Sequence, residues 1–233
     1  MISIVLPTLN EAGNITKLVG DIEQVLRKNN LKAELIIVDD DSEDRTAQIT
    51  RDLNKKYGNI RTLVRHVRDG AGAAHWFGYK SAKGDVVIAM EADNSCDAED
   101  IPKIAKKISE GWDIVVASRY AKGASTNKSL ANKAISRLGN VFISIISGIQ
   151  ISDFTIAYRG FRREIADKIN CVEKDGNPLL MEFILKAKNA GYAKITEIPT
   201  HYRERVSGVS KNKLMKAIPR TFKAAVRISI MGK

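Results

Sequence analysis

The chain has 233 residues, of which 44% are hydrophobic and 28% are charged, a composition that excludes a disordered or fibrous protein. Its longest apolar runs cover about six residues, far fewer than the roughly 20 of a transmembrane helix, and its start lacks the pattern of a secretory leader. We therefore expect neither a membrane span nor secretion. Two widely spaced cysteines, Cys96 and Cys171, fit a reducing, cytoplasmic setting.

The net charge of +11 is concentrated in the second half of the chain. Residues 1–120 carry 17 Lys and Arg against 19 Asp and Glu, a net charge of −2, whereas residues 121–233 carry 21 against 8, a net charge of +13. This asymmetry indicates an anionic partner, with a merely solvated basic surface as the alternative. We do not expect nucleic acid, because few aromatic side chains that could stack on bases lie among these charges.

The first half alternates between short apolar strands and helices. Strands are predicted at 2–7, 34–38, 60–64, 85–90 and 113–117. Helices are predicted at 15–26, 44–57, 71–82 and 98–110. Continuous apolar strands separated by helices predict an α/β fold, with a mostly parallel central sheet and helices on both faces.

The second half is less regular. Its predicted elements are helices at 128–146, 179–190 and 211–231 and strands at 155–161 and 195–199. No internal repeat or low-complexity linker interrupts it. We expect one domain over residues 1–210, followed by a basic amphipathic helix over residues 211–233.

Acidic residues follow three of the predicted strands. Glu11 follows the first strand, Asp39 and Asp40 the second, and Glu91 and Asp93 the fourth. Because ligands of open α/β sheets bind at the carboxyl ends of the strands, these acids would crowd into one crevice. A divalent cation such as Mg²⁺ or Mn²⁺ would offset their charge and would also bind phosphate oxygens, as in a nucleotide diphosphate. Each acid alone also suits a helix cap or a solvated loop.

Other nucleotide-binding motifs are missing. Gly70 and Gly72 match the first two glycines of a dinucleotide fingerprint, but His75 stands where the third glycine belongs. That segment also follows the third strand, not the first. The chain has no G-x-x-x-x-G-K-[ST] sequence, which excludes a P-loop.

Short motifs spread over nearly the whole chain resemble a known family. In the first half they are 5–11 (VLPTLNE), 36–42 (IIVDDDS), 90–93 (MEAD) and 117–120 (ASRY). In the second half they are 135–137 (ISR), 152–155 (SDFT), 181–182 (ME) and 205–211 (RVSGVSK). The first set resembles inverting family 2 glycosyltransferases of the GT-A fold. The second set is similar to the dolichyl-phosphate mannosyltransferase, or polyprenyl-phosphate sugar synthase, branch.

The resemblance implies three groups of site residues. The nucleotide pocket would be lined by Pro7, Leu9, Glu11, Asp39 and Asp40. The D-x-D metal motif would fall on Glu91 and Asp93. The basic residues around the sugar diphosphate and the acceptor phosphate would be Arg119, Arg137, Arg205 and Lys211. Catalytic roles would fall on Asp93, Arg119, Arg137 and Arg205.

The chain departs from the family pattern at three positions in or near these motifs. Glu91 stands where the family usually has Asp, and Ser95 where it has Gln or a similar polar residue. Leu9 replaces a frequent Tyr. Glutamate can still bind Mg²⁺ or Mn²⁺, but its extra methylene can change the metal geometry and the donor preference.

The function that the resemblance implies is inverting, metal-dependent transfer of mannose from GDP-mannose to a polyprenyl or dolichyl phosphate. It would take place on the cytoplasmic face of a membrane, with the enzyme bound peripherally. The acceptor phosphate is already an anion, so the reaction needs positioning more than a general base. A UDP-sugar donor, another acceptor, or a catalytically weak protein that binds sugar nucleotides or lipid phosphates are the alternatives.

The C-terminal segment is basic and amphipathic. No acidic residue follows Glu204, whereas eight Lys and Arg residues do. Apolar residues recur at helical spacing, and Pro219 is expected to kink or restart the helix. Such a helix can lie in a membrane interface or pack its apolar face on the domain, and the pattern alone fits both.

Overall fold

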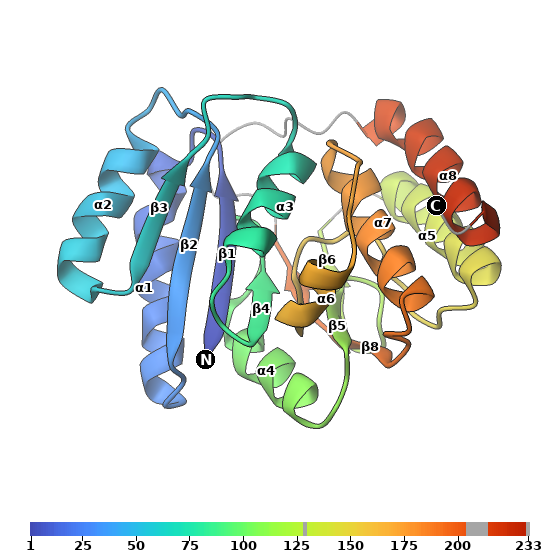
Figure 1. Ribbon diagram of the computed structural model, residues 1–233, viewed down its shortest axis with the longest axis horizontal. Coiled ribbons are helices and arrows are strands. Elements are labelled where there is room, and N and C mark those ends of the chain that lie inside the picture. The colour runs from blue at the N-terminus through green and yellow to red at the C-terminus, as the bar shows by residue number, and fades with distance from the viewer. Residues whose placement is uncertain (128–129, 204–213, 232–233) are drawn as a thin grey trace.

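The computed structural model of the protein describes residues 1–127, 130–203 and 214–231. Its centre is a seven-stranded sheet (Figure 1). From edge to edge the strands are β3 (Ile60–Val64), β2 (Ala33–Asp39), β1 (Ile2–Thr8), β4 (Val86–Ala89), β7 (Arg159–Arg162), β5 (Ile114–Ser118) and β8 (Ile195–Pro199). Only β7 runs antiparallel to its neighbours within this described sheet, so the predicted mostly parallel sheet is confirmed. Two short strands, β6 (Ser125–Thr126) and β9 (His201–Tyr202), pair separately.

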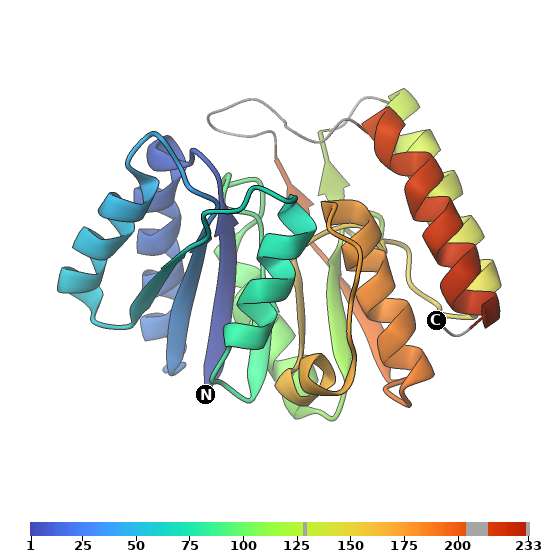
Figure 2. The same ribbon diagram turned by 45° about the horizontal axis from the view of Figure 1, so that its top comes forward.

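Helices cover both faces of the sheet, as predicted. They are α1 (Ala12–Lys28), α2 (Thr46–Tyr57), α3 (Ala71–Ser81), the short 3₁₀ helix η1 (Ala98–Asp100), α4 (Ile101–Ser109), α5 (Leu130–Ser147), α6 (Arg163–Lys168), α7 (Gly176–Asn189) and α8 (Leu214–Met231). Helices α3 and α7 pack together on one face, and α1 and α4 pack together on the other (Figure 1). Helix α8 packs against α7 and α5, and Figure 2 shows α8 and α5 side by side at one end of the molecule.

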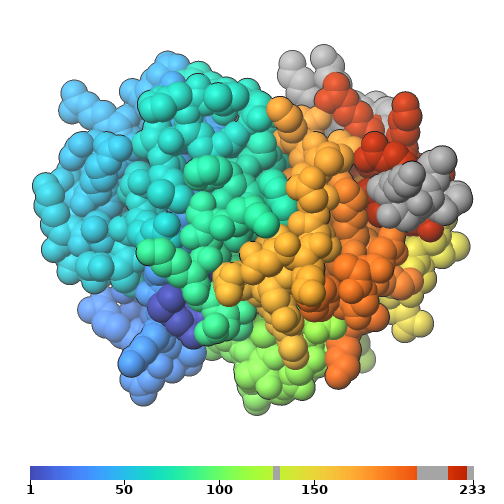
Figure 3. All heavy atoms as spheres, viewed as in Figure 1, coloured from blue at the N-terminus to red at the C-terminus, as the bar shows by residue number. Residues whose placement is uncertain are grey.

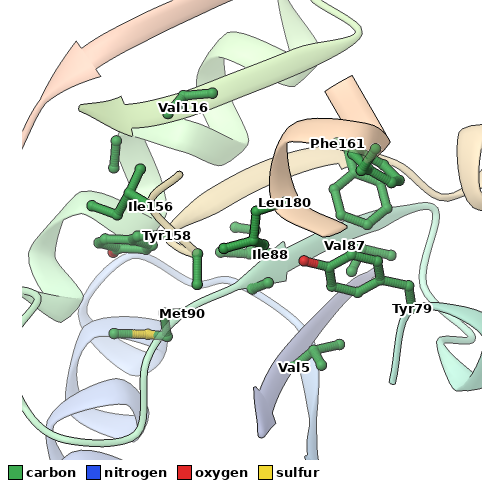
Figure 4. Packing of buried hydrophobic residues seen from close by; sticks show 14 of the residues in the cluster. Val5, Tyr79, Val87, Ile88, Met90, Val116, Ile156, Tyr158, Phe161 and Leu180 are labelled. Atoms are coloured by element: carbon green, nitrogen blue, oxygen red, sulfur yellow. The ribbon is translucent and has the colours of Figure 1, made fainter. Parts of the chain in front are cut away.

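Aromatic rings join α3 and α7 to the middle of the sheet. Tyr79 of α3 meets Phe161 of β7 edge-on, with ring centroids 4.9 Å apart (Figure 4). The ring centroid of Phe183 in α7 lies 4.5 Å from that of Phe161. All three side chains are buried. The α6–α7 segment consequently lies directly beside the α3 segment on the surface, as Figure 3 shows.

Several boundaries differ by a few residues from the sequence-based expectation. The strand expected at 155–161 is observed as Arg159–Arg162, and the helix expected at 179–190 already begins at Gly176. Helix α8 runs without interruption through Pro219, so the expected restart there is wrong. Over the ranges that the structure describes, no helix combines the length and the apolar character that a membrane span requires.

The apolar face of α8 contacts the rest of the protein where its side chains are described. Ala225 and Ile228 are fully buried, whereas Lys223 and Arg227 are exposed. Of the two alternatives for this helix, packing on the domain is the one seen for these residues. The division into residues 1–210 and 211–233 stays a prediction.

Gly78 in α3 marks a close approach between helix and sheet. A Cβ at this position would overlap Cγ1 of Val5. Because overfilled cores force side chains and backbone to shift, we expect Gly78→Ala to lower the free energy of unfolding by about 1–3 kcal/mol. Gly20, inside α1, has no neighbouring atom within 4 Å of its Cβ position, so Gly20→Ala should raise that free energy by about 0.5–1 kcal/mol. Urea unfolding of both variants measures this, and equal shifts would contradict the close approach.

Candidate active site

A cavity of about 390 Å³ opens at the carboxyl ends of β1, β2 and β4. Its walls also include the β3–α3 loop, residues 155 and 157, and the start of α7. The residues singled out from the sequence that line it are Pro7, Leu9, Glu11, Asp40, Glu91 and Asp93. Acids from all three predicted clusters therefore meet in one crevice, as their positions after the strands indicated.

The two acids after β4 are held by neighbouring donors. The Asp93 side chain is buried, and its Oδ1 accepts a hydrogen bond from the Ser95 N–H at 3.0 Å. Glu91 Oε1 accepts one from the Ala157 N–H at 3.2 Å, and Glu91 Oε2 accepts one from the Cys96 thiol at 3.4 Å. Burial raises the pKa of Glu91, and the negative charge of Asp93 raises it further. A cation bound between these carboxylates would relieve that repulsion.

The two neighbouring acids at the end of β2 have different surroundings. Asp39 accepts hydrogen bonds from the hydroxyls of Thr8 at 3.0 Å and Ser42 at 2.7 Å, and it is not among the described residues that line the cavity. Asp40 lines the cavity and pairs with Arg65, whose Nη1 lies 2.9 Å from Asp40 Oδ1. Burial raises the pKa of Asp40 to about 6, against the opposing charge of Arg65. Asp40 thus faces the cavity, while Asp39 braces the loop.

The β1–α1 loop carries Leu9 and Glu11 to the cavity wall, next to Pro7 of β1. It is fastened to the start of α2, because the Glu11 N–H donates to Thr46 Oγ1 at 2.9 Å. Glu11 Oε2 accepts a hydrogen bond from Asn14 Nδ2 at 2.7 Å within the first turn of α1. The carboxylate of Glu11 is therefore held at the cavity by its own helix.

Arg119 follows β5 and is buried in a bidentate ion pair. Its Nε lies 2.7 Å from Asp153 Oδ2, and its Nη2 lies 2.9 Å from Asp153 Oδ1. Nη2 also donates to Thr155 Oγ1 at 3.1 Å, and Thr155 lines the cavity. Tyr120 and Tyr202 present their rings to the guanidinium, with centroids 5.5 and 5.4 Å away. Arg119 therefore supports the cavity wall through Thr155, and its contact with a substrate phosphate stays a prediction.

The sequence matches the family model described as Glycosyl transferase family 2 over residues 3–169, which is most of the chain. The chain belongs to glycosyltransferase family 2. The motifs that resembled this family in the sequence therefore identified it correctly.

Two curated relatives of this family 2 chain have names that refer to dolichol phosphate and to polyprenol monophosphomannose. The chain is 34% identical over 216 residues to dolichol-phosphate mannosyltransferase of Pyrococcus furiosus, an alignment that covers 91% of the chain and 59% of the relative. It is 28% identical over 215 residues to polyprenol monophosphomannose synthase of Mycolicibacterium smegmatis, covering 89% and 79%. The chain thus spans about three fifths of the length of the Pyrococcus protein.

A solved structure shares the fold of this family 2 member. Glucosyl-3-phosphoglycerate synthase from Mycobacterium tuberculosis, in complex with Mn²⁺, UDP and phosphoglyceric acid, superposes with a TM-score of 0.71. The sequences are 18% identical, and the superposition covers 98% of this chain and 78% of that one. The likeness confirms the predicted GT-A architecture.

The other predicted basic residues lie apart from the cavity or outside the description. Arg137 is exposed on α5, with its Cζ 5.6 Å from the centroid of the Tyr120 ring. It lines a cleft of about 320 Å³ that shares no described lining residue with the acidic cavity. Arg205 and Lys211 lie outside the described residues.

Glu91 and Asp93 suit a hard cation that a substrate phosphate helps to hold. Among the described residues, no group of three or more His, Cys, Asp or Glu could hold a metal ion by itself. Mg²⁺ is usually bound in enzymes by one or two carboxylates, with water and substrate phosphates supplying the other ligands. Glu91 and Asp93 supply two neighbouring carboxylates at the cavity, so these residues fit the predicted Mg²⁺ or Mn²⁺.

Sequence reasoning missed several residues of the cavity wall. Arg68 lines it from the β3–α3 loop, with Nη2 2.9 Å from Glu43 Oε1. The position of Arg68 after a predicted strand could have identified it, because the acidic candidates were selected by their positions after strands. Asn177 in the first turn of α7 also lines the cavity. It had no local signal, because α7 reaches this place only by packing on α3.

The raised pKa of Asp40 predicts pH-dependent nucleoside binding. A base N–H donates best to an ionised carboxylate, and Asp40 gains a proton as the pH falls through about 6. If only the ionised form binds, the affinity for guanosine or uridine should fall about tenfold from pH 7 to pH 5. Calorimetry with nucleosides measures this without phosphate or metal near Glu91. The matched variant Asp40→Asn should show no such slope, and equal affinities of the unaltered protein at both pH values would contradict the role of Asp40.

Proposed function

We propose that the protein transfers mannose from GDP-mannose to a polyprenyl phosphate, with inversion at the anomeric carbon and with Mg²⁺ or Mn²⁺ as cofactor. The acid-lined cavity supports the donor half of this proposal, since it suits a diphosphate that shares a cation with Glu91 and Asp93. The names of the Pyrococcus and Mycolicibacterium relatives support mannose and a lipid phosphate.

The observation that carries the acceptor half is an apolar groove joined to the acidic cavity. The groove has a volume of about 290 Å³, and its lining includes Ile135 and Leu138 of α5 and Phe222 of α8. Thr155 and Asn177 line both the groove and the cavity. A phosphate at the cavity could therefore carry an apolar chain that lies along the groove.

The surface of α5 supports a membrane-bound acceptor. Ile135, Leu138, Val141 and Ile145 are all exposed, Leu138 to 71% and Ile145 to 75%. They recur at helical spacing, and an exposed apolar patch of this kind marks an interaction surface. The exposed basic residues of the adjacent α8 would favour anionic lipid headgroups. We place the enzyme peripherally on the cytoplasmic face of a membrane.

In the proposed reaction an acceptor phosphate oxygen attacks the anomeric carbon on the side opposite the nucleotide. The bond from this carbon to the diphosphate oxygen breaks, and the nucleoside diphosphate leaves with the electron pair. The acceptor is already ionised near neutral pH, so the protein has to position it and not deprotonate it. Burial lowers the pKa of His75 in the cavity wall to about 3, so its imidazole stays neutral. A divalent cation held by Glu91 and Asp93 would neutralise charge on the leaving diphosphate.

The test is sugar transfer to a polyprenyl phosphate from GDP-mannose and, in parallel, from UDP-glucose. Each donor is tried with Mn²⁺, with Mg²⁺ and with EDTA. Formation of a lipid-linked mannose that EDTA prevents is the expected result. Transfer only from UDP-glucose would overturn the donor, and nucleotide binding without transfer to this lipid would favour another acceptor or a binding protein.

A further inference from the structure

Arg159 of β7 is the largest fully buried side chain in the described protein. Its guanidinium donates to main-chain carbonyls, and no ion pair joins it to a carboxylate within the described residues. Burial of a guanidinium beside neutral partners alone is costly. A buried guanidinium of this kind is therefore expected to fix the position of the main-chain segments whose carbonyls it binds.

The carbonyls that Arg159 binds belong to two separate segments. Its Nη2 donates to the Phe154 carbonyl at 3.2 Å, and its Nε donates to the Ile156 carbonyl at 3.1 Å. Its Nη1 donates to the carbonyl of Leu180 in α7. Figure 4 shows Ile156 and Leu180 arriving in the core from these different parts of the chain. Arg159 therefore fastens residues 154–156 to α7.

The fastened segment forms part of the candidate active site. The Ala157 N–H donates to Glu91 Oε1, and Ala157 and Thr155 both line the acidic cavity. Thr155 also lines the apolar groove. In the sheet, Arg159 is the register partner of Ala89, two residues before Glu91. The buried Arg159 side chain thus contacts the segment that binds the candidate metal ligand Glu91. The same segment contributes to the walls of both the acidic cavity and the apolar groove.

We propose that Arg159 is a positioning residue of the donor site. By binding the Phe154, Ile156 and Leu180 carbonyls, it fixes the main-chain N–H that orients the Glu91 carboxylate. Arginine suits this task because its planar fork reaches acceptors in several directions, whereas lysine carries the same charge on a single nitrogen. The inference rests on the proposed function only in assigning a cation and a nucleotide diphosphate to the cavity.

Direct binding of Mn²⁺ together with GDP tests the proposal without the need for sugar transfer. Arg159→Lys retains the charge but not the fork, and we expect it to weaken Mn²⁺ binding about tenfold, as loss of a residue supporting metal ligands typically does. Higher Mn²⁺ concentrations should then restore GDP binding. Arg61→Lys is the matched control, because Arg61 also donates to a carbonyl, that of Ser81, and lines no part of the cavity among the described residues. It should change Mn²⁺ binding less than twofold.

The outcomes separate this inference from the proposed function. If the unaltered protein binds Mn²⁺ and GDP and a folded Arg159→Lys variant binds them equally well, only the positioning role of Arg159 is overturned. The proposed function is then unaffected. If the unaltered protein binds neither GDP nor UDP with Mn²⁺, the proposed function fails and the inference with it. Should the variant not fold, amide hydrogen exchange of the unaltered protein decides. We expect the Ala157 N–H to exchange as slowly as those of β7, and fast exchange would refute the positioning role.

Discussion

Replacement of Asp93 by alanine is expected to lower the rate of sugar transfer about a thousandfold without unfolding the protein. Asp93 and Glu91 are the two carboxylates that line the cavity directly after β4. A cation at a leaving diphosphate contributes several kcal/mol, and each 1.4 kcal/mol or so corresponds to a factor of ten in rate. Initial rates of lipid-linked sugar formation measure the loss, and a Mn²⁺ titration should show weaker binding in parallel.

The matched control for this change is at the other end of the same strand. Asp85 precedes β4, is exposed, and pairs with the N-terminal amine at 3.0 Å. Asp85→Asn removes a similar negative charge far from the cavity, so its transfer rate should stay within about twofold, as for most exposed ion pairs. Unchanged turnover of Asp93→Ala would remove Asp93 from the site. A similar loss in both variants would show that the effect is not local.

Apolar runs in the sequence located the parallel strands well, and the antiparallel strand poorly. The predicted strands at 2–7 and 34–38 lie within β1 and β2, because buried parallel strands are apolar along most of their length. The predicted strands at 60–64 and 195–199 also have the bounds of β3 and β8, although these edge strands are only partly buried. The strand predicted at 155–161 begins before β7 does, because residues such as Ile156 are as apolar as those of a strand. The carbonyl of Ile156 is bound by Arg159 in the structure. Strand β7 begins where its pairing begins, with Arg159 opposite Ala89 of β4 and Val116 of β5, and local composition cannot show that pairing.

The site was predictable where it depends on strand ends and not where it depends on side-chain partners. Glu91, Asp93 and Asp40 reach the cavity because the strands before them end at one edge of the sheet. Neighbouring side chains of an extended segment point in opposite directions, and Asp39 is accordingly engaged inside the loop. Arg119 was expected at a substrate phosphate, and its pairing with Asp153 depends on two segments more than 30 residues apart. Such pairings need the tertiary structure.

Removal of Asp153 is expected to cause the largest loss of stability. The carboxylate is fully buried and its bidentate partner Arg119 is 7% exposed, so Asp153→Ala leaves an unpaired buried guanidinium. Such a change typically costs about 3–5 kcal/mol of unfolding free energy. Asp21→Ala, which breaks the exposed pair with Lys17, is the control and should cost less than about 1 kcal/mol. Urea unfolding with linear extrapolation measures both.

The pH dependence of stability provides an independent check on this ion pair. Burial alone would raise the pKa of Asp153, but the charge and hydrogen bonds of Arg119 outweigh it and hold the pKa below its usual range. A carboxyl whose pKa is depressed on folding stabilises the protein above its unfolded pKa of about 3.9, and this stabilisation is lost as the pH falls below that value. Asp153→Ala should therefore flatten the acid limb of the stability curve. An unchanged acid limb would contradict the ionised pair.

A double variant separates the structural role of Arg119 from its predicted contact with phosphate. Arg119→Met combined with Asp153→Leu replaces the pair by apolar side chains, which often restores the stability that the single change removes. If Arg119 also binds a substrate phosphate, the stable double variant should transfer sugar about a hundredfold more slowly, as when one preorganised donor is removed. Full activity in a stable double variant would show that sugar transfer does not require a phosphate contact by Arg119. The guanidinium that supports the cavity wall would then be distinct from the groups that bind the acceptor.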